Sequence, residues 1–314
     1  MSVTLAVDAM GGDFGVEITI PACCDFLQDH PDTKVIAIGS AQAIEQSIHN
    51  CNPNLLDRFQ ILGASEIVLM DDPIEIALRR KKDSSMRVAI EQVQEGKADA
   101  VISAGNTGAL MAISRYILKT LDGIDRPAIA TAIPNELGRG TTVLDLGANA
   151  DCEPIHLLQF AQMADVMLRV VNGNPNPSIG LLNIGEEDSK GNLLSIAAYK
   201  LLSETDEINF IGNIEGRDIF TGVADVIVCD GFTGNIVLKE AEGIFTLMKK
   251  RGIKDEYFDR FNYENYGGTP VLGVKGNAII GHGISNDIAV KNMLLHAHEV
   301  VSSNLAVKIN EAFN

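Results

Sequence analysis

The sequence predicts an α/β protein built on a mostly parallel, doubly wound sheet. Short β-branched runs alternate with helical patterns along the 314 residues, which is typical of successive βαβ units. Four predicted strands run directly into glycine-rich polar loops, in the segments 101–112, 142–154, 180–192 and 226–243. Because open α/β sheets bind ligands outside the carboxyl ends of their strands, these loops indicate a ligand-binding crevice.

Strands are predicted where short aliphatic runs end at turn-forming residues. In chain order they are Val3–Val7, Lys34–Ile38, Phe59–Leu62, Ile67–Leu69, Ala100–Ile102, Ala128–Ile133, Thr141–Leu146, Ile179–Ile184, Ile208–Ile211, Val226–Cys229 and Asn277–Ile280. The intervals between them are long enough for the helical crossovers that parallel strands need.

Helices are predicted where apolar residues recur at intervals of three and four. In chain order they are Val16–Gln28, Ala41–Ile48, Ile74–Arg80, Met86–Glu95, Gly108–Lys119, Glu153–Val171, Leu193–Leu202 and a last helix that starts near Asp287 and carries one apolar stripe to Ile309. Ser40 suits a helix N-cap, Pro73 a first helical turn and Gly96 a helix end. The charged, irregular segment 249–268 predicts a short helical arm, or else a helical hairpin packed on the body or on a second subunit.

The chain shows no internal repeat, low-complexity tract or linker that would mark a domain boundary. Its length allows a large buried core, and 46% of its residues are hydrophobic. We therefore expect a single α/β catalytic domain over residues 1–314. Two lobes that share one crevice are the alternative.

Charge limits the classes of partner. The chain has 25 basic and 42 acidic residues, which give a formal net charge of −17. This charge disfavours nucleic acid and anionic membranes as general partners. Trp is absent, so a stacking surface for single-stranded nucleic acid is not expected. One basic cluster, Arg79, Arg80, Lys81 and Lys82, reverses the charge locally. It is either a solvated helix end or a docking patch for an acidic partner or a phosphate-bearing group.

The cysteines and the N-terminus bear on location. Five cysteines without C-x-x-C spacing predict a reducing compartment rather than a disulfide framework or a zinc site. We expect them to be small buried side chains rather than nucleophiles, Cys229 beside the Asp230 loop included. The first residues lack the pattern of a signal peptide, and no apolar run is long enough to span a bilayer. These features predict a cytoplasmic protein.

Several common catalytic motifs are missing. No G-x-G-x-x-G follows the first strand, and the chain has no Walker loop, G-x-S-x-G elbow or H-E-x-x-H helix. His296 and His298 are two residues apart on a predicted helix, so they face different ways and make a poor metal pair. We predict neither a metal nor a cofactor. His282, between two glycines, is either a ligand-binding residue or a hydrogen-bonded turn residue.

Eight segments together resemble one known family. In order they are DAMGGD, RRKKDSSM, SAGNTGALMA, RPAIATAIP, LDLGANAD, NIGEEDSKGN, EGRDIFTGVADVIVCDGFTGN and YGGTPVLGVKGNAIIGHG. They span nearly the whole chain and are similar to the PlsX-type phosphate acyltransferases of bacterial phospholipid synthesis. The resemblance implies transfer of a fatty acyl group from acyl carrier protein to inorganic phosphate, giving acyl phosphate. It also implies a homodimer and a fold like that of isocitrate and isopropylmalate dehydrogenases.

Members of this family also associate peripherally with membranes. Between the helix after Asp230 and YGGTPVLG they usually carry a longer, apolar helical excursion. Here the segment is short and charged, which argues against membrane contact, and also against the family's usual dimer contacts, through this element.

Three alternatives compete with this function. The first uses acyl-coenzyme A as the donor, and the second is a metal- and NAD-dependent dehydrogenase of the related fold. A dehydrogenase would need a metal-binding aspartate cluster, for which Asp218, Asp225 and Asp230 are the candidates, and an arginine set that the sequence lacks. The third is a non-catalytic protein that binds an acyl carrier.

Attack of phosphate on a thioester needs a held anion and a stabilised oxyanion more than a covalent intermediate. We predict that Lys190 neutralises one of these, that Asp230 orients Lys190 or accepts a proton, and that Asn235 is also catalytic. The predicted substrate-binding residues all come from the polar loops: Gly105, Asn106, Thr107, Gly108, Asn149, Asp151, Gly231, Thr233, Gly234, His282 and Ser285. A solvated lysine and a helix cap are the alternatives for Lys190 and Asp230. The cluster from Arg79 to Lys82 is predicted to dock the acidic carrier protein.

Overall fold

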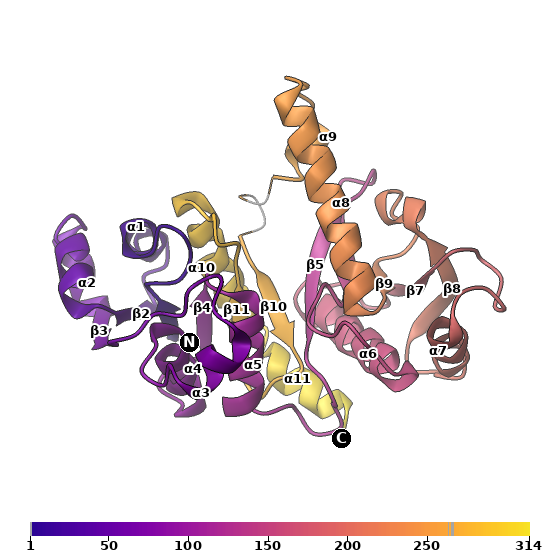
Figure 1. The fold of residues 1–314 in the computed structure, drawn as a ribbon, viewed down its shortest axis with the longest axis horizontal. Helices are drawn as coiled ribbons and strands as arrows, with labels where there is room; N and C mark the ends of the chain where they lie inside the picture. The colour runs from indigo at the N-terminus through magenta and orange to yellow at the C-terminus, as the bar shows by residue number, and fades with distance from the viewer. Residues whose placement is uncertain (1, 263, 265–266) are drawn as a thin grey trace. The chain divides into compact units, whose positions relative to one another are not determined.

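The computed structural model describes residues 2–262, 264 and 267–314, and the chain divides into two compact units (Figure 1). Unit 1 comprises Met1–Leu121 and Tyr263–Ala306, and unit 2 comprises Asp122–Asn262 and Val307–Asn314. Both are layered α/β structures in which most neighbouring strands are parallel. The prediction of a mostly parallel α/β fold is therefore confirmed.

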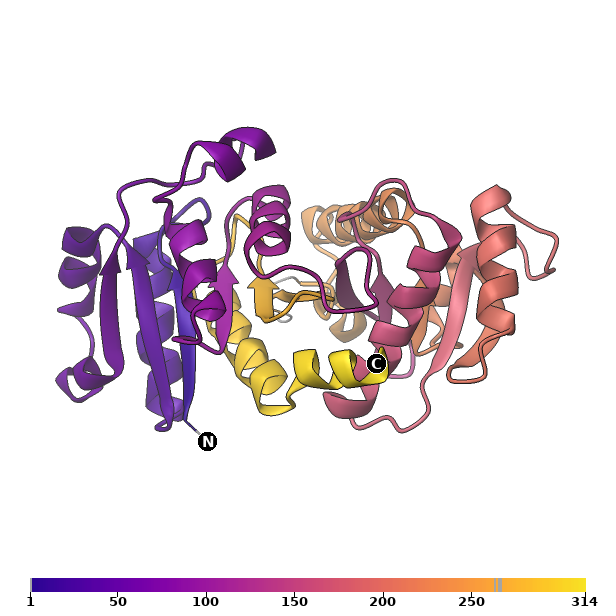
Figure 2. The same cartoon turned by 90° about the horizontal axis from the view of Figure 1, so that it is seen from below.

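Among its described residues, unit 1 contains six strands in the order β3-β2-β1-β4-β11-β10. Figure 2 shows the indigo and purple strands of this unit side by side. Their bounds are β1 Val3–Asp8, β2 Thr33–Gly39, β3 Phe59–Gly63, β4 Ala100–Ser103, β10 Thr269–Leu272 and β11 Asn277–Ile280. Only β10 and β11 pair antiparallel, and β10 was missed by the sequence analysis. Because β1, β4 and β11 are parallel neighbours, the loops that follow them leave the sheet at the same edge.

The helices of unit 1 bury the apolar stripes that the sequence predicts. They are α1 Val16–Asp29, α2 Ala41–Ile48, the 3₁₀ turn η1 Pro53–Arg58, α3 Ile74–Arg79, α4 Ser85–Gln94, α5 Thr107–Ile117 and α10 Asp287–Ser302. The Ser40 hydroxyl accepts a hydrogen bond from the Ala43 N–H, as an N-cap should, and Gly96 ends α4 with a φ of 68°.

Unit 2 is built around five strands in the order β5-β6-β9-β7-β8. Its elements are β5 Ala128–Pro134, β6 Gly140–Leu144, α6 Pro154–Val170, β7 Ser178–Asn183, α7 Leu193–Ser203, β8 Asn209–Glu215, the 3₁₀ turn η2 Gly216–Phe220, β9 Val226–Val228, α8 Gly231–Lys250 and α9 Glu256–Asp259. β5 and β6 form an antiparallel hairpin, whereas β6, β9, β7 and β8 are parallel. The loops after β6, β9 and β7 therefore share one edge of this sheet.

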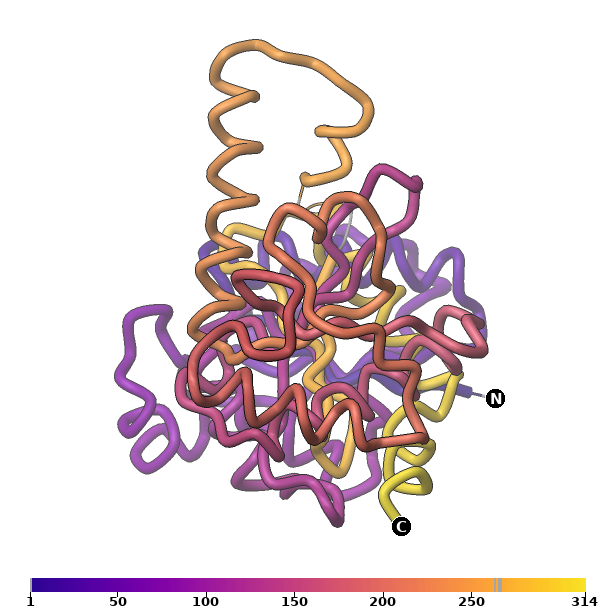
Figure 3. Tube along the Cα trace, turned by 90° about the vertical axis from the view of Figure 1, so that its right-hand side faces the viewer, coloured from indigo at the N-terminus to yellow at the C-terminus, as the bar shows by residue number. Residues whose placement is uncertain are grey.

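Helix α8 is exposed over most of its length, and only Gly231, Gly234 and Ala241 on it are buried. Figure 3 shows it in orange, extending away from the rest of unit 2. The chain then returns to the β5–β6 hairpin, where the Tyr257 hydroxyl donates to the Pro134 carbonyl at 3.3 Å and Arg260 donates to the Asn135 carbonyl at 3.1 Å. Of the aromatic residues in segment 249–268, Tyr263 and Tyr266 lie outside the described residues.

Two sequence predictions of elements are wrong. The last helix is not continuous: α10 ends at Ser302, Asn304 adopts a left-handed φ of 55°, and α11 Leu305–Ala312 begins anew. Residues Ile67–Leu69 form no strand. The Lys81 ammonium donates to the Ile67 carbonyl and the Asn106 amide to the Leu69 carbonyl, so side chains occupy the groups that a sheet partner would use.

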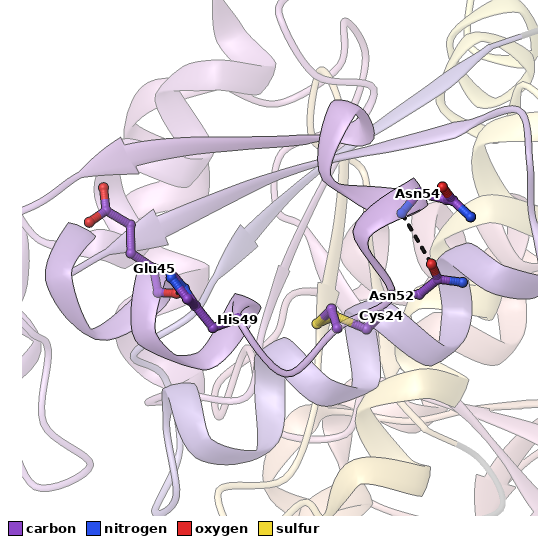
Figure 4. The surroundings of a disulfide bond; sticks show 6 residues. Cys24, Glu45, His49, Asn52 and Asn54 are labelled. Carbon is purple, nitrogen blue, oxygen red and sulfur yellow. Dashed lines mark hydrogen bonds between the residues drawn. A yellow bond between two sulfur atoms is a disulfide. The ribbon is translucent and has the colours of Figure 1, made fainter.

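The prediction that the cysteines stay unpaired is also wrong at one position. Cys24 in α1 and Cys51 after α2 form a disulfide, with their Cα atoms 5.9 Å apart (Figure 4). The partners are 27 residues apart in sequence, and the packing of α2 beside α1 brings them together. Cys23, Cys152 and Cys229 are free thiols.

Candidate functional site

In unit 1 a buried carboxylate supports the loop after β4. The Ser103 hydroxyl donates to Asp8 Oδ2 at 2.7 Å and accepts from the Gly105 N–H at 3.0 Å. Asp8 and Ser103 are both buried, and burial raises the pKa of the Asp8 carboxyl. The N–H of Gly105, which we predicted to bind substrate, is therefore already committed to Ser103.

The next residues form the start of α5. Asn106 is the N-cap, and its Oδ1 accepts from the Ala109 N–H at 3.0 Å. Its Nδ2 lies within hydrogen-bond distance of the carbonyls of Leu69, Met70 and Asp72, so the side chain fastens that loop to the helix. By contrast, the N–H groups of Thr107 and Gly108 have no acceptor in the described part of the chain. They are the groups at this helix start that an anion can use.

The loops after β1 and β11 meet beside that helix start. The Asp13 N–H donates to the Gly283 carbonyl at 2.8 Å, joining the two loops. Ser285 is buried, and its hydroxyl donates to the His282 carbonyl at 2.6 Å. The structure thus gives Ser285 a turn-forming role, while the His282 side chain is half-buried at the same edge.

The basic cluster is divided. The Lys81 ammonium forms an ion pair with Asp72, largely shielded from solvent, and also donates to the Ile67 carbonyl at 2.7 Å. Arg79, Arg80 and Lys82 are exposed, and Arg79 pairs with Glu75 one helical turn away. Three of the four predicted docking residues are thus accessible, and Lys81 is a structural residue.

In unit 2 the central residue of the loop cluster is one that the sequence analysis missed. Asp145 is fully buried at the end of β6, after a cis Leu144–Asp145 peptide. Its carboxylate accepts from the N–H groups of Ile129, Ala148 and Asn149 at 3.0, 3.2 and 2.6 Å, and from Asn149 Nδ2 at 2.9 Å. Burial raises the pKa of Asp145, and these four donors oppose the rise. The sequence signal was a polar residue two positions before a strand-end glycine in LDLGANAD.

Gly231 and Gly234 of the Asp230 loop allow the start of α8 to pack directly against Asp145. A Cβ on Gly231 would lie 2.6 Å from Asp145 Oδ2, and one on Gly234 would lie 1.9 Å from the Asp145 carbonyl oxygen. The Gly231 N–H donates to the Asn149 carbonyl at 2.8 Å. The sequence predicts that Gly231 and Gly234 bind substrate; the close approach that the structure shows at both is that of α8 to the β6 loop.

Asp230 is the N-cap of α8. Its Oδ1 accepts from the Thr233 N–H at 2.9 Å and its Oδ2 from the Thr233 hydroxyl at 2.8 Å. Asn235 is exposed one turn further on, where a Cβ on Gly147 would lie 3.4 Å from its side chain. Asp230, Thr233 and Asn235 therefore lie with the β6 loop at one edge, as their loop pattern predicted.

Lys190 lies in the loop after β7. Its carbonyl accepts from Asn183 Nδ2 at 3.0 Å and its N–H donates to the Glu187 carbonyl at 3.1 Å, so the backbone is fixed. The side chain is exposed, and its ammonium has no ion-pair partner in the described ranges. Of the secondary candidates, Asn149 is buried and bonded to Asp145, whereas Asp151 is exposed.

Cys229 is poorly suited to nucleophilic chemistry. Its thiol is buried and lies 3.7 Å from the Asp145 carbonyl, and burial raises its pKa well above the ordinary thiol value. Residues 2–262, 264 and 267–314 contain no group of three or more His, Cys, Asp or Glu side chains placed to hold a metal ion. They also contain no helix that combines the length and the apolar character needed to cross a bilayer.

The predicted site residues thus form two groups. Gly105, Asn106, Thr107, Gly108, His282 and Ser285 belong to the strand-end loops of unit 1. Asn149, Asp151, Lys190, Asp230, Gly231, Thr233, Gly234 and Asn235 belong to those of unit 2. The groups placed to meet an anion are the N–H groups of Thr107 and Gly108 in unit 1 and the Lys190 ammonium in unit 2, and none of them is a nucleophile.

Comparison with known proteins gives a consistent result. A family described as "Fatty acid synthesis protein" matches residues 3–257. A phosphate acyltransferase from Polynucleobacter asymbioticus is 56% identical over 100% of this chain and 98% of its own length. A phosphate acyltransferase from Cupriavidus metallidurans is 48% identical over 100% of this chain and 92% of its own length.

Solved structures with low identity share the fold. A phosphotransacetylase from Streptococcus pyogenes has a TM-score of 0.66 at 16% identity, covering 95% of this chain and 94% of its own. A 4-hydroxythreonine-4-phosphate dehydrogenase described as putative, from Salmonella typhimurium, has a TM-score of 0.58 at 13% identity, covering 96% of this chain and 99% of its own. Since one architecture is found in an acyltransferase and in a dehydrogenase, it does not by itself identify the reaction.

Proposed function

We propose that this chain, which belongs to the PlsX-type phosphate acyltransferase family, moves a fatty acyl group from acyl carrier protein to inorganic phosphate and releases acyl phosphate. Membership of the family makes it an acyltransferase of fatty acid and lipid synthesis. The observation that carries the proposal is similarity over the full chain to proteins named phosphate acyltransferase. The acyl carrier protein donor and the acyl phosphate product are what the resemblance to this family implies, and we propose them for this chain.

The chemistry balances without an added reactant. A phosphate oxygen attacks the thioester carbonyl, the carbon–oxygen bond forms, and the carbonyl oxygen takes on negative charge. The carbon–sulfur bond then breaks, and the carrier leaves as a thiolate that is protonated from phosphate or solvent. A thiol with a pKa near ~8.5 is a good leaving group, so the enzyme's main task is to place the anion and stabilise the oxyanion.

Named residues suit these tasks. In unit 2 we assign Lys190 to neutralise phosphate or the oxyanion, since its ammonium is exposed on a fixed backbone. Asp230 and Asn235 lie at the same strand edge and are assigned to orient the reacting groups. In unit 1 the N–H groups of Thr107 and Gly108 are assigned to an anion.

The finer parts of the proposal concern partner and location. Exposed Arg79, Arg80 and Lys82 support a donor that carries negative charge. We propose acyl carrier protein as that donor, with acyl-coenzyme A, which bears phosphates, as the alternative. We propose a cytoplasmic homodimer. The isocitrate dehydrogenase-like classification and an arm over residues 249–268 remain predictions.

A Lys190→Ala variant tests the assignment. We expect at least about a hundredfold loss of acyl phosphate formation, because removing a preorganised charge from a transition state typically costs that much. The assay uses an acyl carrier protein thioester and labelled phosphate. The control is Lys200→Ala, which removes an exposed lysine of α7 in the same unit. Full activity in Lys190→Ala, with an unchanged melting temperature, would remove this lysine from the mechanism.

A further inference from the structure

Unit 1 exposes a group of large apolar side chains beside its strand-end loops. We call Phe14, Leu69, Met70, Ile74 and Ile284 the apolar strip. Each is between 45% and 54% exposed, although side chains of this kind are usually buried. Clustered exposed apolar groups at the edge of a site mark a surface that binds an apolar ligand or partner.

Contacts within unit 1 place the strip at the loops. A Cβ on Gly108 would lie 2.9 Å from Ile74 Cδ1, so this side chain covers the start of α5. A Cβ on Gly283 would lie 2.7 Å from Met70 Cε. The Asp13 N–H, next to Phe14, donates to the Gly283 carbonyl. Residues from three separate chain segments are thus joined around the Thr107 and Gly108 N–H groups.

The segment that carries most of the strip is held in place. Asn106 Nδ2 bonds the Met70 carbonyl at 2.9 Å and the Asp72 carbonyl at 3.2 Å. Lys81 pairs with the Asp72 carboxylate, and the Leu69 N–H donates to the same carboxylate at 2.7 Å. The Met70 and Asp72 carbonyls and the Leu69 N–H are therefore occupied, while the Leu69 and Met70 side chains are exposed on a fixed support.

Charge identifies the occupant. Exposed carboxylates adjoin the strip at Asp13, Asp71 and Asp287, and these repel an anionic lipid surface. Exposed Arg79 and Arg80 lie at the other end of α3 from Ile74, about 8 Å along the helix axis. An acidic partner docked at the basic end would deliver an attached hydrocarbon chain to the apolar end.

We propose that the apolar strip binds the hydrocarbon chain of the acyl donor and so sets the preference for chain length. This inference rests on the proposed function and adds a binding site to it. The chain lies over Leu69, Met70 and Ile74, with its carbonyl end directed to the start of α5. Each further methylene that reaches the strip buries more apolar surface, so donors with long chains bind more tightly and donors with short chains do not.

The experiment pairs two variants of the full-length protein. The first carries Leu69→Ser and Met70→Ser, which remove exposed side chains and leave the backbone bonds in place. The control carries Leu56→Ser, an exposed leucine in η1, which precedes β3 and so lies at the opposite edge of the sheet. Kinetics are measured with butanoyl and hexadecanoyl groups on the same carrier. Binding is measured with the corresponding non-transferable amide analogues.

The double variant should raise KM for the hexadecanoyl donor about tenfold and weaken binding of the hexadecanoyl amide analogue equally. The KM and the analogue affinity for the butanoyl group should stay within about twofold of those of the unaltered protein. Equal effects on both chain lengths, or none, would overturn the inference. Loss of sedimentation with phosphatidylglycerol vesicles, with unchanged analogue binding, would overturn it in favour of a membrane surface. If the unaltered enzyme transfers no acyl group, the proposed function fails. Titration with the amide analogues still decides whether the apolar strip binds a long hydrocarbon chain.

Discussion

At the scale of single residues, Asp145 organises unit 2 more than any residue that the sequence singled out. Its carboxylate accepts four hydrogen bonds from N–H donors, and it is fully buried. The same residue limits positions 231 and 234 to glycine, because any Cβ there would strike it. The Asp230 loop and the Asn149 loop are therefore aligned through one side chain.

Substituting Asp145→Ala should destabilise unit 2 by at least about 3 kcal/mol, because four buried donors lose their acceptor. Asp145→Asn should cost less, because one acceptor oxygen remains. Thermal unfolding followed by circular dichroism measures both. Asp188→Asn, an exposed change in the same unit, is the control. A melting temperature for Asp145→Ala equal to that of the control would contradict this account.

The Asp145 pair of variants also carries a pH prediction. The folded pKa of Asp145 is raised above the unfolded value of about 3.9, so the folded state binds the proton more readily. The protonated Asp145 carboxyl therefore adds its full contribution to the free energy of unfolding at pH values below the unfolded pKa. That contribution is lost as the pH rises through the folded pKa. Acidification from neutral pH towards about 4 should therefore raise the free energy of unfolding of the unaltered protein relative to that of Asp145→Asn. A stability difference that is flat or shrinks on acidification would be inconsistent with the raised pKa.

Single residues also show where sequence patterns stop being informative. The N-T-G pattern correctly located the start of α5 at a strand end, whereas α8 begins at Gly231, inside the D-G-F-T-G-N segment that was predicted as a loop. Neither pattern separates capping from ligand binding, because the side-chain oxygens of Asp230 and Asn106 that would meet a ligand are the ones that cap the helices. Asp145 was missed because its importance comes from N–H donors on two backbone segments, at Ile129 and in the loop at Ala148 and Asn149, which only the folded chain brings together.

At the scale of elements, local patterns predicted most helices and strands well. Helix α2 and strand β11 have the bounds that the sequence predicted. The failures depend on contacts between distant positions. Leu305 and Ile309 are buried as their spacing predicted, yet the backbone breaks at Asn304 between them and α10. The Cys24–Cys51 bond depends on how α1 packs beside α2, which no spacing rule gives.

Helix α3 and the residues after it provide an element-scale test of carrier docking. A triple variant, Arg79→Glu, Arg80→Glu and Lys82→Glu, should raise KM for acyl carrier protein by about tenfold or more and leave KM for phosphate unchanged, because like charges then face each other. Lys81 is left intact because its ion pair with Asp72 holds the loop.

The matched control for that variant is Lys249→Glu, Lys250→Glu and Arg251→Glu at the end of α8. It makes the same change in charge at three exposed positions of unit 2. An unchanged carrier KM in the α3 variant would contradict docking at α3, and an equal rise in both variants would show that overall charge rather than α3 determines docking.

At the scale of the whole molecule, where the net charge is −17, salt acts on stability and on carrier binding at α3 in opposite directions. Self-repulsion among 42 acidic side chains opposes the compact state, so screening by salt favours folding. The attraction between the basic α3 surface and an acidic carrier is weakened by the same screening. A protein of this charge therefore binds its carrier best at ionic strengths where it is least stable.

Salt titration separates the two effects. Between about 10 mM and 150 mM sodium chloride the Debye length falls from about 30 Å to about 8 Å. We expect the melting temperature to rise by about 2 °C or more while KM for the carrier rises at least about threefold. In the α3 triple variant the melting temperature should still rise, but the carrier KM should fall with salt, since salt now screens a repulsion between like charges. A melting temperature that falls with salt would contradict the repulsion argument, and a carrier KM that still rises with salt in the α3 variant would place the docking surface elsewhere.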